Sequence, residues 1–493
     1  MNSSLELHVA IIGSGPSGFY AAAELLNQTN PIIFVDMFDR LPTPFGLVRG
    51  GVAPDHAKIK TVTKVYEKIA AHPRFRFFGN VEFGKELFLK DLERFYGAVI
   101  FAVGAKSDRK MGIPGEDLKG SDPATIFVGW YNGHPDYKNY NFDLTAKRVA
   151  VIGNGNVAMD VTRILAVDPK KLQSSDIADY ALETLKKSKV EEIFLLGRRG
   201  PAQAAFTNPE IRELCELEGA DLVIEPKETD LDELSKRSLE QGAGGLTAKN
   251  NVKILQEQSQ KPIKNQPKKI IVKFLVSPVE LIGDNGKVTG IKLEKNKLYL
   301  EKDGSLRPKG TGEYETLPMD LVFRSVGYKG VPLTDLPFDP RSGTIPNEKG
   351  RVMELENKKV IPGHYVVGWA KRGPSGVIGT NKPDSIETVH KLLEDFSKNQ
   401  LRNPSHSIPS IQINSEEKNK DDSSQSQQEK ILDLLKERKI AFVSYEDWKT
   451  LDQAEIEQGK KKGKEREKYT TIPDMLSAIK KYKVQSLPKN ERF

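Results

Sequence analysis

The sequence predicts an α/β protein with two Rossmann-like domains, one of them discontinuous and the other inserted into it. Two glycine-rich turns, Gly13–Gly18 and Gly153–Ala158, each follow an apolar run of strand length and precede a helical pattern. A third apolar run ending in glycine, Tyr365–Gly368, predicts that the chain returns to the first domain near its end. Strand, glycine turn and helix together bring backbone N–H groups against a pyrophosphate, so both domains are expected to bind dinucleotides.

The composition favours a globular protein without membrane insertion. The chain has 493 residues, 38% hydrophobic and 29% charged, which is enough for two or three domains. No apolar run approaches the roughly 18 residues that cross a bilayer. The first strand is reached by about His8, which leaves no room for a signal peptide, so a cytoplasmic location is expected. The net charge of +7 permits an acidic partner, and no nucleic-acid-binding motif accompanies the lysines.

Cys215 is the only cysteine. A single cysteine excludes an internal disulfide, a CxxC redox pair and a cysteine-held iron–sulfur cluster. Disulfide reductases of the thioredoxin or glutathione type are therefore excluded, as are electron-transfer subunits that carry clusters. Because it lies in the amphipathic pattern Ile211–Leu217, Cys215 is interpreted as a small hydrophobe and not a reactive thiol.

The first part of the discontinuous domain is predicted to span residues 1–106. Strands are expected at Val9–Ile12, Ile32–Val35 and Ala98–Gly104, where short apolar runs alternate with amphipathic stretches. Helices are expected from Pro16 to about Asn27 and from about His56 to Ala71.

The inserted domain is predicted to span residues 107–330. Its first helix is expected to run on from the second glycine turn to about Lys189. Residues 225–270 are polar and are interpreted as a surface excursion outside the core. The remaining apolar runs predict four strands, Ile193–Leu196, Ile270–Leu275, Gly290–Leu293 and Thr316–Phe323.

Residues 331–396 are predicted to complete the first domain. Residues 397–430 hold few apolar positions and predict a polar linker or loop. Residues 431–493 show helical patterns and predict a C-terminal helical segment packing on the first domain. Within it, Lys460–Lys464 is interpreted as a solvated basic turn.

The residues at the end of the next strand distinguish the two ligands. After the first turn, Asp36 and Asp39 both stand where a carboxylate accepts hydrogen bonds from a ribose diol and repels a 2′-phosphate. After the second turn, Arg198 and Arg199 stand there instead, and guanidinium groups bind phosphate by paired hydrogen bonds. The first site therefore suits FAD or NAD, and the second suits NADPH over NADH.

FAD in one domain and NADPH in the other imply hydride transfer to a flavin. One alternative is a non-catalytic dinucleotide-binding sensor, which would leave the flavin spectrum unchanged under anaerobic NADPH. An NADPH diaphorase with another acceptor is a further alternative.

The chain resembles the adrenodoxin reductase family of ferredoxin–NADP reductases, especially its bacterial members. The resemblance becomes specific at Leu41–His56 and spans nearly the whole chain. Further matches are Gly153–Asp160, Gly197–Pro201 with Gln203–Thr207, Arg324–Tyr328, Gly368–Asn381, Trp448, Asp452 and Gly463–Lys468.

The resemblance implies a discontinuous FAD domain that encloses an NADPH domain. Of the two acids, Asp39 matches the family's ribose-binding Glu and is one methylene shorter. The residues implied to contact FAD are Gly13, Gly15, Pro16, Ser17, Gly18, Asp39, Leu47, Trp369, Gly376, Val377 and Ile378. Those implied to contact NADPH are Gly153, Asn154, Gly155, Asn156, Val157, Arg198, Arg199 and Glu210.

The resemblance also implies single-electron transfer to a small acidic iron–sulfur protein, a ferredoxin or similar, with flavodoxin as another candidate acceptor. His56 and Glu213 are the titratable candidates beside the rings, where either one would relay a proton. The alternative for each is a structural role, His56 as a packing or capping residue and Glu213 as a helix-surface carboxylate. Lys236 and Arg237 are candidate docking contacts. A monomer without a metal is expected.

Overall fold

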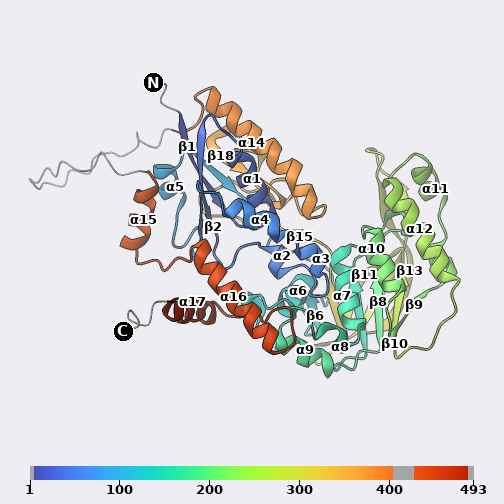
Figure 1. Cartoon of the computed structure of the whole chain (residues 1–493). Helices are drawn as coiled ribbons and strands as arrows, with labels where there is room; N and C mark the ends of the chain where they lie inside the picture. Colours follow the sequence, from blue (N-terminus) through green and yellow to red (C-terminus); the bar gives the residue numbers. More distant parts are fainter. Residues whose placement is uncertain (1–4, 403–426, 487–493) are drawn as a thin grey trace, which may run out of the picture.

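The computed structural model describes residues 5–402 and 427–486 (Figure 1). The first domain is built on a seven-stranded sheet whose central strand, β4 (Ala98–Phe101), is buried along its whole length. Its strands come from two distant parts of the chain, because β18 pairs in parallel with β4, and β4 with β1. In spatial order the strands are β16 (Asn347–Glu348), β17 (Arg351–Met353), β18 (Val360–Val366), β4 (Ala98–Phe101), β1 (Glu6–Ile12), β2 (Ile32–Phe38) and β3 (Phe75–Phe78).

Helices cover both faces of this sheet (Figure 1). On one face, α1 (Pro16–Leu26), α4 (Thr63–Ala70) and α14 (Asn381–Ser397) share an apolar core with β1, β2 and β4. On the other face, α5 (Leu89–Phe95) and α15 (Gln427–Glu437) pack against β1 and β4. A sheet buried on both faces explains the continuous apolar runs in the sequence.

The second domain is built on a six-stranded parallel sheet. On one face lie α6 (Ala124–Tyr131), α7 (Asn156–Ala166), α10 (Asn208–Cys215) and α12 (Gly245–Ser259). An antiparallel sheet of β11 (Val276–Asp284), β12 (Lys287–Leu300) and β13 (Leu306–Pro318) covers the other. In spatial order the parallel strands are β6 (Ser121–Pro123), β14 (Leu321–Arg324), β7 (Arg148–Ile152), β8 (Glu192–Leu196), β10 (Lys268–Lys273) and β9 (Ala220–Ile224).

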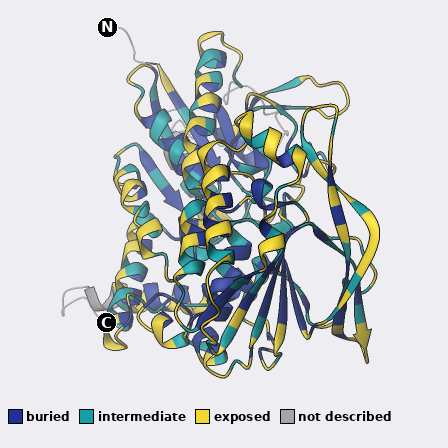
Figure 2. Ribbon diagram, turned by 90° about the vertical axis from the view of Figure 1, so that its right-hand side faces the viewer, coloured by how far each residue is buried: buried dark blue, intermediate teal, exposed yellow. Residues whose placement is uncertain are grey.

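Two short strands, β5 (Ser107–Asp108) and β15 (Tyr328–Lys329), pair where the chain passes between the domains. The C-terminal helices α16 (Tyr445–Lys461) and α17 (Ile472–Ser486) pack on the first domain through Trp448, Leu451 and Met475. The strands of both sheets are buried while the outer helix faces are exposed (Figure 2). Among the described residues, no helix has the length and apolar character needed to cross a membrane.

Three expected elements are shorter than the sequence predicts. The helix after the second turn ends at Ala166, and α8 (Pro169–Leu172) and α9 (Asp179–Lys186) follow, because Pro169 cannot continue a helix. The helix expected from His56 to Ala71 is two helices, α3 (Ala57–Lys60) and α4. The strand expected at Thr316–Phe323 is interrupted, since β13 ends at Pro318 and β14 begins at Leu321.

Two interpretations of polar segments are wrong. Residues 225–270 contribute to the core, because Ile254 and Leu255 of α12 are buried in the cluster around β7 and β8. The basic turn is not fully solvated either: the Lys464 side chain is buried and pairs with Asp179 and Glu467, each at 2.6 Å. Most of the predicted linker, residues 403–426, lies outside the described residues.

Candidate active site

The first glycine turn has the geometry of a phosphate cradle. Gly13 has φ +105°, and a Cβ there would lie 2.5 Å from the carbonyl oxygen of Ala102. Around a Cβ at Gly15, by contrast, nothing lies within 4 Å. Gly15 is also the N-cap of α1, and no side chain caps that helix end. The cradle is therefore closed toward β4 and open on the side where N–H groups point, which fits a pyrophosphate.

The second turn repeats this geometry. Gly153 has φ +134°, and a Cβ there would lie 2.2 Å from the carbonyl oxygen of Ser325. Gly155 again has nothing within 4 Å of its Cβ position and is the uncapped N-cap of α7. Asn156, at the first turn of α7, accepts a hydrogen bond from the Thr207 backbone N–H at 2.9 Å. Two dinucleotide sites therefore have the same backbone design.

The structure separates the two acids of β2. Asp39, just beyond the strand, accepts hydrogen bonds from the N–H of Ser14 at 2.9 Å and from its hydroxyl at 2.6 Å. Asp36 is buried and accepts from Arg76 and from the Tyr96 hydroxyl at 2.7 Å. Asp39 thus lies beside the cradle, while Asp36 belongs to a structural ion pair.

The expected flavin contacts gather on exposed backbone at the end of β18. Trp369 begins the short helix α13 (Trp369–Arg372), and its ring lies 5.0 Å from that of Tyr328. Gly376 has φ +78°, and a Cβ there would lie 2.4 Å from the Thr380 hydroxyl. Val377 is 52% exposed. Leu47, at the start of α2 (Leu47–Gly50), is also exposed, whereas Ile378 packs partly against the domain core.

Arg372 shapes the segment that carries Gly376. Its guanidinium donates hydrogen bonds to the Ser375 hydroxyl at 3.1 Å, to the Thr380 hydroxyl at 3.1 Å and to Asn381 at 3.0 Å. One side chain thus holds both ends of the loop 375–381. Backbone N–H groups on such a fixed loop suit a planar ligand such as a flavin ring.

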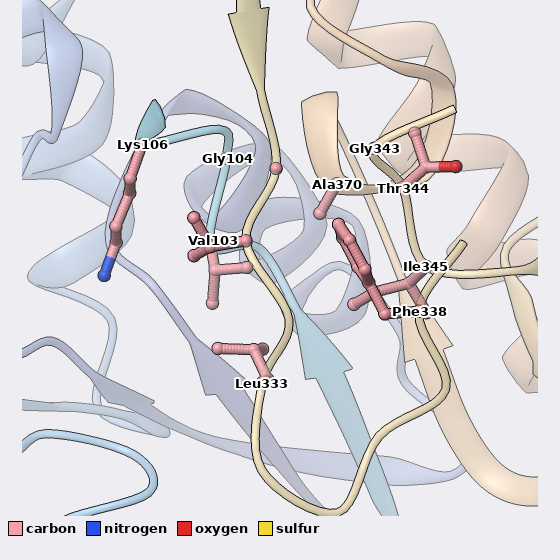
Figure 3. A pocket seen from close by; sticks show the side chains of 11 residues that line it. Val103, Gly104, Lys106, Leu333, Phe338, Gly343, Thr344, Ile345 and Ala370 are labelled. Atoms are coloured by element: carbon pink, nitrogen blue, oxygen red, sulfur yellow. The ribbon is translucent and has the colours of Figure 1, made fainter. Parts of the chain in front are cut away.

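A small cavity lies beyond the end of β4, between Val103, Leu333 and Phe338 (Figure 3). Its volume of about 10 Å³ is room for one water molecule at most. The Lys106 side chain points away from the apolar side chains around it. The cavity is therefore a packing seam and not a substrate site.

The arginine turn after β8 has the character of an anion site. Neither Arg198 nor Arg199 has a carboxylate at ion-pair distance within residues 5–402 and 427–486. Burial, with the nearby charges of Arg198 and Arg307, lowers the pKa of Arg199. A cavity of about 390 Å³ lies beside Arg199 and is lined by residues 202–207. Clustered guanidinium groups without a carboxylate fit a phosphate group.

Titratable side chains of both domains meet at the junction. His56 Nε2 lies 2.9 Å from Glu213 Oε2, and His56 Nδ1 lies 3.7 Å from Asp160 Oδ1. His56 precedes α3 in the first domain, whereas Asp160 and Glu213 lie on α7 and α10 of the second. Because α7 begins at the second cradle and also carries Asp160, this one helix connects the expected pyrophosphate site with the junction.

Arg163 is the centre of this junction. Its buried guanidinium binds both oxygens of Asp55 at 2.8 Å and lies 2.9 Å from Asp160. It also lies 3.5 Å from Glu210 and 3.4 Å from Glu213. Although burial opposes it, the Arg163 hydrogen bond lowers the pKa of Asp55. This arginine therefore links the two domains and offsets part of the negative charge of their acids.

His56, Glu210 and Glu213 offer ligand atoms within 4.8 Å of one another, a spacing that a metal ion would accept. The Arg163 guanidinium already supplies the positive charge there, since it lies 3.5 Å or less from both carboxylates. Burial and the charge of Asp160 raise the pKa of Glu210 to about 7. The junction is accordingly a cluster whose positive charge comes from Arg163 and in which Glu210 holds a proton more tightly than a free carboxyl group does.

Cys215 is partly buried against the second core, and burial raises the pKa of its thiol to about 11. This agrees with its interpretation as a hydrophobe. Lys236 and Arg237 lie on α11 (Glu233–Glu240), at the edge of the molecule far from α2 and α3 (Figure 1). This helix is remote from the junction between the two domains.

Sequence reasoning missed Arg163. The available signal was the spacing of Asp160 and Arg163, three residues apart on a helix that opens at a glycine cradle. That pattern predicts an ion pair on one face, yet it does not show that Asp55 of the other domain completes the site.

Comparisons with known proteins agree with this geometry. Residues 7–195 match the family model described as pyridine nucleotide-disulphide oxidoreductase. The chain is 45% identical to NADPH-ferredoxin reductase FprA of Mycobacterium leprae, over 95% of this chain and 97% of that protein. It is 39% identical to the mitochondrial NADPH:adrenodoxin oxidoreductase of Arabidopsis thaliana, over 97% and 96% of the two chains.

A solved structure of Mycobacterium tuberculosis FprA in complex with NADPH superposes with a TM-score of 0.86 and 43% identity. The match covers 96% of this chain and 99% of that one. The similarity thus extends over nearly the whole of both chains. The chain therefore belongs to the adrenodoxin reductase-like family of ferredoxin–NADP reductases.

Proposed function

We propose that this protein is an FAD-dependent ferredoxin–NADP reductase, which takes hydride from NADPH and passes single electrons to a ferredoxin-type iron–sulfur protein. One observation carries the proposal: two open, uncapped glycine cradles have opposite charge at the ribose end. Asp39 is hydrogen-bonded to Ser14 beside the first, and Arg198 and Arg199 follow the strand beside the second.

FAD, when bound, supplies an acceptor that takes two electrons together and releases them one at a time. In the first domain, the N–H groups of α1 would hold its pyrophosphate and Asp39 its ribose. The loop that Arg372 fixes would place the Gly376 backbone against the ring. Trp369 and Val377 would exclude water from that face.

In the second domain, the N–H groups of α7 would bind the NADPH pyrophosphate, and Arg198 and Arg199 its 2′-phosphate. Glu210, Asp160 and Glu213 lie between that cradle and the first domain. His56 holds Glu213 at 2.9 Å and is the group that would carry a proton between the junction and the flavin side. Arg163 positions these side chains by holding Asp55 and Asp160 together.

The acceptor in this proposal is an acidic ferredoxin, with flavodoxin as the second candidate. The net charge of +7 favours an acidic partner, so association is expected to weaken as salt rises. The proposal includes a monomer in the cytoplasm. A single cysteine without a disulfide agrees with a reducing compartment.

The test is reduction of purified ferredoxin by the holoenzyme under anaerobic NADPH, followed by the ferredoxin absorbance. The proposal requires turnover that depends on ferredoxin. The turnover rate should also fall as the salt concentration is raised from about 50 to about 300 mM, because salt screens the attraction between the charged partners. Flavodoxin is measured in parallel. Flavin reduction without electron transfer to either acceptor would contradict this function and favour a diaphorase.

A further inference from the structure

We propose that Arg307, at the start of β13 beside the turn of the β12–β13 hairpin, is a third guanidinium of the 2′-phosphate site and a determinant of the preference for NADPH over NADH. This inference rests on the proposed function, which places the 2′-phosphate at Arg198 and Arg199. Three structural observations support it: the attachment of the hairpin, the position of its turn and the surroundings of Arg307.

The hairpin is attached to the arginine turn by Asn296. Its side-chain amide donates to the carbonyl oxygen of Arg198 at 2.9 Å and to the Ser277 hydroxyl at 2.8 Å. The Asn296 backbone N–H donates to Leu275 at 2.7 Å, and the Leu275 N–H donates in turn to the Arg199 carbonyl at 3.2 Å. Asn296 is buried, so these bonds are shielded from water. The hairpin and the arginine turn are therefore one connected unit.

The turn of the hairpin lies on the cavity beside Arg199. Gly304, Ser305 and Leu306 line the same cavity of about 390 Å³ that Arg199 lines. The start of α12 lines it as well, and Gly244 there is an N-cap without a side-chain cap. The lining therefore combines a guanidinium, an uncapped helix start and the hairpin turn, which suits an anionic group.

Arg307 comes directly after Leu306 in the chain, and Leu306 is the last hairpin residue that lines the cavity. The Nε of Arg307 donates to the Ser305 hydroxyl at 3.2 Å, which ties the side chain to the cavity wall. Within the part of the chain that the structure describes, its nearest carboxylate is that of Asp303, 3.9 Å away and beyond hydrogen-bond reach. That carboxylate already accepts from Ser305 at 2.9 and 2.6 Å. Arg307 is 56% exposed, so its guanidinium has room to turn toward a ligand.

The electrostatic surroundings of Arg199 also support a role for Arg307. Arg307 is near enough to Arg199 to contribute, after burial and Arg198, to the lowered pKa of Arg199. Three guanidinium groups close together repel one another, and a dianionic phosphate among them would convert that repulsion into attraction. NADH carries no phosphate at this position, so it gains nothing from Arg307. The residue would therefore act on the choice of nucleotide and not on hydride transfer itself.

The test compares Arg307→Ala with wild-type holoenzyme. Competition by 2′,5′-ADP and by 5′-AMP measures the phosphate contact directly, and flavin reduction by NADPH and NADH gives KM and kcat. We expect Arg307→Ala to weaken 2′,5′-ADP about five- to tenfold, as for one partly exposed charged hydrogen bond. The KM for NADPH should rise by the same factor, while kcat, 5′-AMP binding and the NADH constants change less than about twofold.

Three further variants make the result decisive. Lys90→Ala removes one exposed positive charge from α5 of the other domain and should leave every constant unchanged. Arg307→Lys keeps the charge without the planar fork and should recover part of the 2′,5′-ADP affinity. Arg198→Ala tests the proposed NADPH site itself and should weaken 2′,5′-ADP at least as much as Arg307→Ala.

Three results would overturn the inference. If Arg307→Ala changes nothing while Arg198→Ala weakens 2′,5′-ADP, the NADPH site stands and Arg307 has no part in it. If Arg307→Ala weakens 2′,5′-ADP and 5′-AMP equally, the residue supports the shape of the cavity and does not read the phosphate. If Arg198→Ala itself has no effect on 2′,5′-ADP, the proposed site fails, and the proposal for Arg307 fails with it.

Discussion

Asp36 and Asp39 stand three positions apart in the chain, and their surroundings give them different roles. Asp36 lies within β2, where Arg76 and Tyr96 bind it in the interior. Asp39 lies past the end of the strand, where Ser14 of the cradle binds it. The end of a parallel strand is where ligands bind in such sheets, so position along the strand decides between structure and function.

Asn substitutions at these two acids should therefore fail in different ways. Asp39→Asn should lower FAD affinity about five- to tenfold, since one charged hydrogen-bond acceptor is lost, with little change in the free energy of unfolding. Asp36→Asn should cost about 2–4 kcal/mol of folding stability, because a buried ion pair is broken. FAD release followed by fluorescence and urea unfolding of the holoenzyme measure the two effects. Equal loss of FAD from both variants would contradict this division.

Glu210 predicts a pH dependence. Its side chain is 9% exposed, and burial with the charge of Asp160 raises its pKa from 4.5 to about 7. The folded state therefore binds this proton more tightly than the unfolded state, and stability is lost as pH rises from 4.5 through 7. Relative to Glu210→Gln, the wild type should lose about 2 kcal/mol of unfolding free energy between pH 5 and pH 8.

Urea titrations of both proteins at the two pH values measure this difference. A parallel pH response of wild type and Glu210→Gln would show that Glu210 is ionised in the folded protein throughout the range. NADP⁺ is left out of these titrations, because it would contact the same cluster.

At the scale of elements, the two cradles act as independent phosphate sites of one design. Ala at Gly15 or Gly155 meets no protein atom within 4 Å, so both variants should fold. Each added methyl group would stand where a pyrophosphate approaches the helix N-terminus. We expect Gly15→Ala to weaken FAD binding at least tenfold and Gly155→Ala to weaken NADP⁺ binding by a similar factor.

In this experiment, each cradle variant is also tested for binding at the other cradle. Gly155→Ala should retain FAD and its visible spectrum, which shows that the first domain is intact. Gly18→Ala is the contrasting variant, because its Cβ would lie 2.3 Å from the Gly13 carbonyl oxygen and should reduce folding stability instead. Loss of FAD from Gly155→Ala would argue against two separate sites.

Sequence patterns predicted those parts of the fold and of the site that depend only on residues close together in the chain. A glycine turn after an apolar strand needs only neighbouring residues, so both cradles and the arginine turn were predicted at their positions. Lys464 and Arg163 depend on partners from distant segments, Asp179 and Asp55, and sequence alone shows neither contact. The polar segment 225–270 was misread because one buried face of α12 is enough to join the core.

For the whole molecule, a chain of ion pairs ties the C-terminal segment to both domains. Lys468 lies 2.9 Å from Asp176 of the second domain, and Lys60 of α3 lies 2.6 Å from the same carboxylate. Lys468 also donates to the backbone carbonyl groups of Arg49 and Asn132. Although buried, Asp176 has a lowered pKa because both lysines stabilise its charge. Segments that meet at one carboxylate restrict how the domains move relative to each other.

This cluster predicts an order of stabilities. Asp176→Asn leaves two lysines without their shared carboxylate and should cost about 3–5 kcal/mol. Lys468→Met leaves the Asp176 pair with Lys60 intact and should cost less, about 1–3 kcal/mol. Urea unfolding of the FAD-loaded enzyme gives both values. A larger loss from Lys468→Met than from Asp176→Asn would contradict the shared role of the carboxylate.

The central claim is that electrons pass from a nucleotide held by arginines to one held beside a carboxylate. The most direct measurement is anaerobic stopped-flow loss of the flavin absorbance with NADPH and with NADH, in wild type and in the Arg198→Ala/Arg199→Ala variant. The account predicts rapid reduction of the wild type by NADPH at low concentration, and a double variant in which the preference for NADPH over NADH falls at least about a hundredfold, two charged contacts being lost. An unchanged preference in the double variant, or a flavin that NADPH does not reduce, would contradict it.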